Sequence, residues 1–125
     1  SLPSVQSKYK TQFYDQLQEM NEVFALQRLY ESRGEWEKAM KVATEQKNLL
    51  MWRKSYNRVN RKIQQINRQI RLIEADKRLS NAEIIDKVRQ LNVLKNDMIR
   101  ALIEQVLEYE KKTGERVKRE RWFTL

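Results

Sequence analysis

Hydrophobic residues recur at alternating steps of four and three over residues 49–76. Three uninterrupted heptads of this pattern are typical of a helix that supercoils against a partner helix. The seam of this helix consists of Trp52, Tyr56, Val59, Ile63, Ile66, Ile70 and Ile73. Asn60 and Asn67 flank the seam one heptad apart. They either fix the register of the helix pair by hydrogen bonding or lie at its solvent-exposed edge.

A second long helix is predicted over residues 81–112. Ser80 followed by Glu83 forms a capping box: the hydroxyl accepts from a backbone N–H of the first turn, and the carboxylate accepts from the N–H of the cap residue. An apolar heptad follows, and Gly114 ends the helix. Because few residues connect the two long helices, they must run antiparallel as a hairpin.

Two further helices are predicted before the hairpin, over residues 4–33 and 35–47, with Gly34 between them in a left-handed conformation. The first has an apolar face made of Tyr9, Phe13, Leu17, Met20 and Phe24. Such a face is typical of a helix buried in a bundle, and we expect both helices to pack along the hairpin. The predicted fold class is all-α, a helical bundle of about four helices built on a long antiparallel coiled-coil hairpin.

Residues 1–115 are predicted to form a single helical bundle domain, and 116–125 form a basic tail with an aromatic end. The tail is either a last turn folded back onto the bundle or a peptide that docks into a neighbouring subunit or domain. In the second case its docking residues are Arg119, Arg121, Trp122 and Phe123. The chain begins Ser1-Leu2-Pro3, without an initiator Met or a signal peptide, so we interpret it as a fragment of a longer chain.

The composition excludes most kinds of catalytic site. The chain has 125 residues, which fits one domain, and only 2 glycines and 1 proline, so turns must be few. Cysteine and histidine are absent, and no phosphate-binding or metal-binding motif is present. Asp15 with Glu19, and Glu104 with Glu108, are interpreted as solvated carboxylates one helical turn apart. We therefore predict that the chain is not an enzyme, with no catalytic residue, metal, cofactor or small-molecule substrate.

Positive charge is concentrated on the helix over 49–76. The formal net charge is +9, which favours polyanionic partners. Between Arg53 and Arg78 there are nine basic and two acidic residues. Over 15–45 there are seven acidic and four basic residues. The residues expected to contact nucleic acid or an acidic partner are Arg53, Lys54, Arg58, Arg61, Lys62, Arg68 and Arg71. Such a row contacts phosphates without reading bases. No stretch approaches the roughly 20 apolar residues that span a bilayer, and we expect no membrane contact in this segment.

Residues 70–83 read Ile-Arg-Leu-Ile-Glu-Ala-Asp-Lys-Arg-Leu-Ser-Asn-Ala-Glu. This run resembles the pattern Ile-Arg-x-Ile-x-x-Asp-x-x-Leu-Ser-x-x-Glu of helical domains in very large bacteriophage proteins. Phe13-Tyr14-Asp15 and the corner from Gly34 to Ala39 match further parts of that pattern. Over roughly residues 13–108, the chain is similar to the helical domain near the C-termini of phage large polyvalent proteins and internal virion (ejection) proteins. It departs from the pattern at Lys77, where proline is common.

The resemblance implies a non-enzymatic structural or assembly module of an internal virion protein, which helps to build a conduit for genome delivery. Its partners would be copies of itself or other virion proteins, and DNA backbone or acidic partners on its basic helix face. Its location would be the virion and, on infection, the host cell envelope; without the resemblance, a cytoplasmic protein is expected. Two alternatives stay open: a stand-alone, sequence-independent nucleic-acid-binding helical protein, and a coiled-coil adaptor between proteins.

Overall fold

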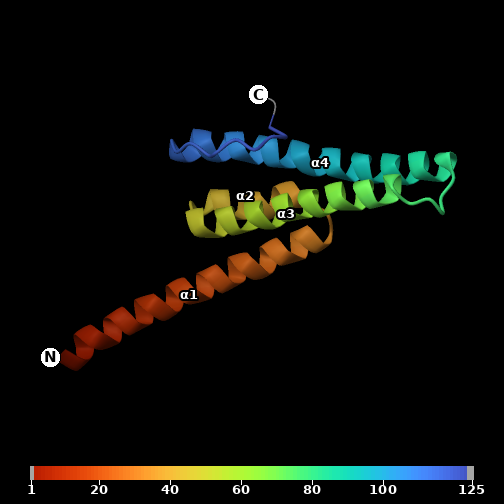
Figure 1. The fold of residues 1–125 in the computed structure, drawn as a ribbon. Helices are drawn as coiled ribbons and strands as arrows, with labels where there is room; N and C mark the ends of the chain where they lie inside the picture. The colour runs from red at the N-terminus through yellow and green to blue at the C-terminus, as the bar shows by residue number, and fades with distance from the viewer. Residues whose placement is uncertain (1, 124–125) are drawn as a thin grey trace.

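The computed structural model describes the backbone of residues 2–123 and the side chains of residue 12 and residues 15–123. The described part of the chain forms four helices and contains no strand, which confirms the all-α fold class (Figure 1). The helices are α1 (Leu2–Ser32), α2 (Trp36–Glu45), α3 (Leu49–Glu74) and α4 (Asn81–Thr113). Their bounds lie within two residues of the predicted ones, and the tail follows α4 without regular secondary structure up to a turn near its end.

Helices α3 and α4 form the predicted antiparallel hairpin (Figure 1). All of the seam residues are buried except Ile73, which is half-buried beside the hairpin turn. They share one hydrophobic core with Met98, Leu102 and Val106 of α4. At the other end of the hairpin the Trp52 ring stacks on the ring of Tyr109, with 4.2 Å between their centroids. The heptad pattern therefore identified the core of the hairpin correctly.

Both asparagines beside the seam form hydrogen bonds to other elements. The side-chain oxygen of Asn67 accepts from Lys95 Nζ of α4 at 3.2 Å, and that of Asn60 accepts from Trp122 Nε1 of the tail at 3.0 Å. Each residue is half-buried. Asn67 thus bonds the partner helix of the hairpin, as the first interpretation expects, whereas Asn60 bonds the tail and not the partner helix.

Local chemistry explains the turns. In the hairpin turn, Ser80 Oγ accepts from the Glu83 N–H at 3.2 Å, and the Glu83 carboxylate accepts from the Ser80 N–H at 3.1 Å, which confirms the capping box. Gly34 and Gly114 both adopt positive φ, +72° and +74°, as expected for residues that follow a helix end. Lys47 adopts the same left-handed conformation after α2, with φ +53°.

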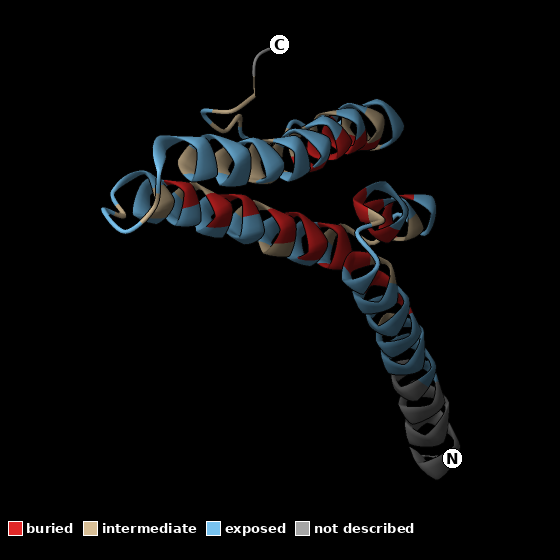
Figure 2. Ribbon diagram, turned by 90° about the vertical axis from the view of Figure 1, so that its right-hand side faces the viewer, coloured by how far each residue is buried: buried red, intermediate tan, exposed pale blue. Residues whose placement is uncertain are grey.

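Helix α1 departs from the prediction, because it does not pack along the hairpin. Only its C-terminal turns contact α2 and α3, and the helix then leads away from the bundle (Figure 1, Figure 2). Leu17 and Phe24 of the predicted face are 42% and 44% exposed. The side chains of Tyr9 and Phe13 lie outside the described residues. Met20 of that face packs against the core, as does Val23, which with Leu26 and Tyr30 was expected to widen it. The predicted apolar face is therefore buried only in part.

The buried face of α1 consists of Val23, Gln27 and Glu31, four residues apart from one another. Two of these three side chains are polar, so the spacing of hydrophobic residues does not identify this face. They are buried because α3 supplies donors and acceptors for them. Helix α2 fills the remaining space at this end of the hairpin with Trp36, Ala39, Met40 and Ala43. The core therefore runs along the seam of α3 and is widest at the end of the hairpin covered by α2 and the last turns of α1 (Figure 2).

Candidate functional site

The predicted basic residues of α3 do not all belong to one surface. Five of them are exposed and form no hydrogen bond or ion pair with another described side chain: Arg53, Lys54, Arg61, Arg68 and Arg71. We call these five residues the basic face. Lys54, Arg61 and Arg68 follow one another at intervals of seven, on the side of α3 that points away from its buried seam. At 1.5 Å per residue, the basic face extends over about 27 Å.

Arg58 and Lys62 were expected on the same surface, and the structure places them elsewhere. The guanidinium of Arg58 is half-buried and binds Glu31 of α1, with Nε at 2.9 and 3.1 Å from the two carboxylate oxygens. The ammonium of Lys62 lies over the Trp36 ring of α2, 5.0 Å from its centroid. Both residues sit on the flank of α3 that faces α1 and α2. The assignment of Arg58 as a free contact residue is therefore corrected, because its ion pair holds the fold. Lys62 is exposed, and its contact with an external partner stays a prediction.

Arg58 is the centre of a polar network that attaches α1 to α3. Besides the Glu31 carboxylate, it binds the side-chain oxygen of Gln27 through Nη2 at 3.3 Å. Gln27 Nε2 donates to the backbone carbonyl of Met51 at 3.2 Å, and the Ser55 hydroxyl donates to Glu31 at 3.5 Å. Every polar group that α1 buries here thus has a partner on α3. The network was missed at the sequence level, where Gln27 and Glu31 have the appearance of ordinary surface residues.

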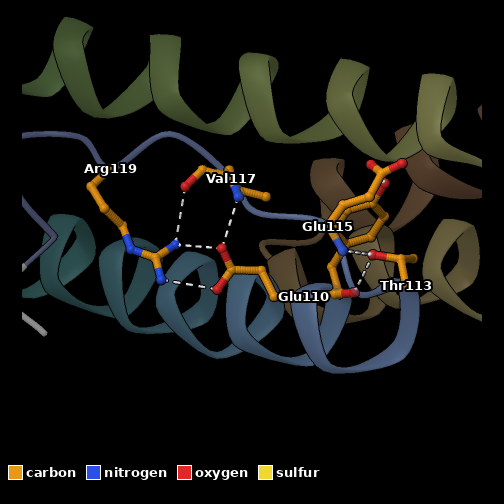
Figure 3. A network of polar contacts seen from close by, with 6 residues as sticks. Glu110, Thr113, Glu115, Val117 and Arg119 are labelled. Atoms are coloured by element: carbon orange, nitrogen blue, oxygen red, sulfur yellow. Dashed lines mark hydrogen bonds and ion pairs between the residues drawn. The ribbon is translucent and has the colours of Figure 1, made fainter.

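The tail folds back onto the bundle, so its interpretation as a peptide that docks elsewhere is corrected. Arg119 forms a two-pronged ion pair with Glu110 of α4, with nitrogen–oxygen distances of 2.8 and 2.9 Å (Figure 3). The Arg119 guanidinium also lies 4.4 Å from the Phe123 ring centroid. The Glu110 carboxylate also accepts from the Val117 N–H at 2.7 Å (Figure 3). Of the four predicted docking residues, Arg119, Trp122 and Phe123 contact the bundle or one another, and Arg121 is exposed.

These contacts have consistent effects on ionisation. The hydrogen bonds from Arg119 hold the pKa of the Glu110 carboxyl below its usual range. Burial, together with the nearby Glu120 carboxylate that accepts from its hydroxyl, raises the pKa of Tyr56, so that this phenol stays a neutral donor. A hollow between α3 and the tail is lined by Arg53 of the basic face and by Lys118 of the tail. The tail therefore adds its own exposed cations beside one end of the basic face.

The carboxylates that the sequence places one helical turn apart lie on α1 and α4. Burial, followed by a hydrogen bond with Glu104 of α4, raises the pKa of Glu37 of α2. Asp15 and Glu19 are exposed on α1. The described side chains contain no cluster of three or more acidic residues suited to a metal ion. Within the same residues, no helix is both long and apolar enough to cross a membrane.

Comparison with family models, curated proteins and solved structures found no match to this chain.

The basic face has the chemistry of a phosphate-contacting surface. Guanidinium groups bind phosphate oxygens with two parallel hydrogen bonds, and four of the five residues are arginines. The row lies on a helix that is held rigidly by α4, so its spacing does not depend on a flexible loop. Basic side chains of this kind contact backbone phosphates, and carry no base-specific information by themselves.

Proposed function

We propose that this chain is a non-enzymatic assembly module of a phage internal virion (ejection) protein, whose basic face contacts the DNA backbone during genome delivery. The observation that carries the DNA contact is the basic face itself. Internal ion pairs engage Arg58 and Arg119, whereas five cations of α3 are exposed along about 27 Å of the helix. The phage setting is supported by the resemblance of residues 13–108 to the helical domain of such proteins.

The adaptor alternative has less support. A coiled-coil adaptor needs an exposed apolar stripe on α3, but that stripe is buried against α4. It would otherwise use the tail, which packs against α3 and α4 through Trp122 and Arg119. The stand-alone nucleic-acid-binding alternative shares the basic face with our proposal and differs from it in predicting no self-assembly.

DNA binding is tested by fluorescence anisotropy with a labelled duplex at increasing salt. Five phosphate contacts predict a slope of log K against log salt of about −4.5, at roughly 0.9 per contact. The variant Arg61→Gln/Arg68→Gln should reduce the slope to about −2.7 on the same basis. As a matched control, Arg89→Gln/Lys111→Gln removes two charges from exposed positions of α4 and should leave the slope nearly unchanged. Equal losses in both variants would show that net charge, and not the basic face, binds DNA.

Assembly is tested by light scattering at low salt and at about 0.5 M salt, with and without the duplex, because salt at that level screens contacts between exposed charges. Discrete oligomers that persist at high salt support the assembly module. A monomer that binds DNA at low salt and releases it at high salt would overturn it in favour of the stand-alone nucleic-acid-binding protein.

A further inference from the structure

The α3–α4 hairpin carries an apolar groove that no helix covers. Near the hairpin turn the groove is lined by Gln69, Leu72 and Ile73 of α3 and by Lys87, Gln90, Leu91 and Leu94 of α4. We call this set the hairpin groove. Leu72 is 72% exposed and Leu94 is 43% exposed, whereas Ile73 and Leu91 are half-buried. In Figure 1 only the other end of the hairpin has a third helix, α2, beside it.

The hairpin groove continues the side of the hairpin on which α2 packs. Lys62 of α3 lies over Trp36 of α2, and Gln69 follows it by seven residues, two helical turns along the same side. Ala101 of α4 lines a hollow beside the start of α2, and Leu94 precedes it by seven residues. The same side of the hairpin therefore binds a helix at one end and offers a free apolar groove at the other.

Helix α1 carries the matching surface. Leu17 and Phe24 are 42% and 44% exposed and lie seven residues apart on one side of α1. Leu17 belongs to the part of α1 that leaves the bundle, whereas Phe24 lies where α1 still contacts α3, with the Arg58 guanidinium 5.3 Å from its ring centroid. The interval from Leu17 to Phe24 spans about 10.5 Å, and so does the interval from Lys87 to Leu94 along the groove. The segment 15–22 of α1 has three carboxylates and no basic residue, whereas the residues that line the groove include Lys87 and no carboxylate. The two surfaces are thus complementary in apolar spacing and in charge.

A chain cannot join its own two surfaces. From the corner at Gly34, α1 runs toward the end of the molecule opposite to the hairpin turn (Figure 1). We propose that α1 of one copy docks into the hairpin groove of a second copy, with Leu17 and Phe24 against Leu72 and Leu94. Because the two surfaces differ, the contact is heterologous, and it produces a ring or a filament of copies. This inference rests on the proposed assembly function and specifies the contact between neighbouring copies. Of the two assemblies, a ring has the geometry that a conduit requires.

The contact is tested by light scattering at high salt on single-site variants at exposed positions. Leu17→Glu and Leu72→Glu each place a charge in one of the two surfaces, and each should reduce the oligomer to the 15.3 kDa monomer. Val93→Glu is the matched control, since Val93 is 58% exposed on α4 but does not line the groove, and it should assemble as the unmodified chain does. Circular dichroism checks that all three retain the helical content of the unmodified chain.

Mixing the variants tests the heterologous geometry. Leu17→Glu retains an intact groove and Leu72→Glu an intact α1, so their equimolar mixture should form a 1:1 dimer that cannot extend. Two outcomes overturn the inference alone: an oligomer that neither substitution disrupts, or one that Leu17→Glu disrupts and Leu72→Glu does not, which indicates that α1 pairs with α1. An unmodified chain that stays monomeric at every concentration overturns the assembly function as well.

Discussion

Removing Arg58 should destabilise the protein more than removing any other basic residue of α3. The guanidinium and the Glu31 carboxylate are only 15% and 6% exposed, so the ion pair is shielded from solvent. Arg58→Met leaves the carboxylate buried with the Ser55 hydroxyl at 3.5 Å as its remaining donor, and Gln27 loses a donor to its side-chain oxygen. Breaking a buried pair by removing one partner costs about 3–5 kcal/mol. We expect a loss near the lower limit, about 3 kcal/mol, because the pair lies at the edge of the bundle.

The free energy of unfolding is measured by urea denaturation, followed by far-UV circular dichroism. Arg61→Met is the matched control: it removes an exposed arginine three residues farther along α3, and it should change the stability by no more than about 0.5 kcal/mol. The double variant Glu31→Met/Arg58→Met removes both charges, and should be more stable than Arg58→Met alone, since no unpaired charge stays buried.

Two results would refute this reasoning. If Arg58→Met costs less than about 1 kcal/mol, the pair behaves as a surface salt bridge, and the network does not hold α1. If the double variant is as unstable as the single one, the loss comes from packing and not from an uncompensated carboxylate. In the first case the Arg58 side chain would be available for external partners, and its place among the DNA-contacting residues would have to be restored.

Two further predictions concern the helix ends and the tail. Lys47→Gly should stabilise the protein by about 1 kcal/mol in urea denaturation, because Lys47 has a left-handed φ of +53° that glycine adopts without a Cβ clash. As a control, Lys41→Gly inside α2 should cost about 1 kcal/mol. A loss of stability at both positions would contradict the prediction of strain at Lys47. The Glu110 carboxyl has a folded-state pKa below its ordinary value of 4.5, so its contact with Arg119 stabilises the protein above that pH and is lost as the pH falls through the folded pKa. When unfolding is followed as a function of pH, Arg119→Gln should be less stable than the unmodified chain at neutral pH, and the difference should shrink in acid. Arg121→Gln, at an exposed neighbouring position, should show no such trend. A loss of stability in Arg119→Gln that is independent of pH would contradict the stabilising role of the ion pair with Glu110.

The hairpin was predictable from the sequence because its determinants are local. A seven-residue repeat of large apolar side chains identifies the buried side of α3 without knowledge of its partner. Ser80 and Glu83 likewise form the cap of α4 through their own backbone, and Gly34 and Gly114 supply the left-handed positions. Each of these features is decided by residues within two helical turns of one another.

The buried face of α1 and the place of the tail were not predictable in the same way. Gln27 and Glu31 are buried only because Arg58, more than twenty residues away, satisfies them. The sequence allows two interpretations of the tail. What decides between them is a set of acceptors far along the chain, such as Asn60, which accepts from Trp122 62 residues away. A hydrophobic pattern cannot detect a polar residue that becomes buried through a partner from another element.

The same distinction explains which basic residues of α3 form the candidate surface. Helical periodicity correctly separates the apolar seam from the charged remainder, but the remainder covers more than half of the helix circumference, and part of it faces α1 and α2. Arg58 and Lys62 lie on that part: Arg58 forms an ion pair with Glu31, and Lys62 lies over the Trp36 ring. Arg61, on the opposite side from the seam, has no such neighbour. The charged residues of α3 therefore have two roles. Those on the flank toward α1 and α2 hold the bundle together, and those of the basic face remain to bind a polyanion. A variant that removes charge from the flank should thus alter stability, and one that removes it from the basic face should alter the salt dependence of DNA binding.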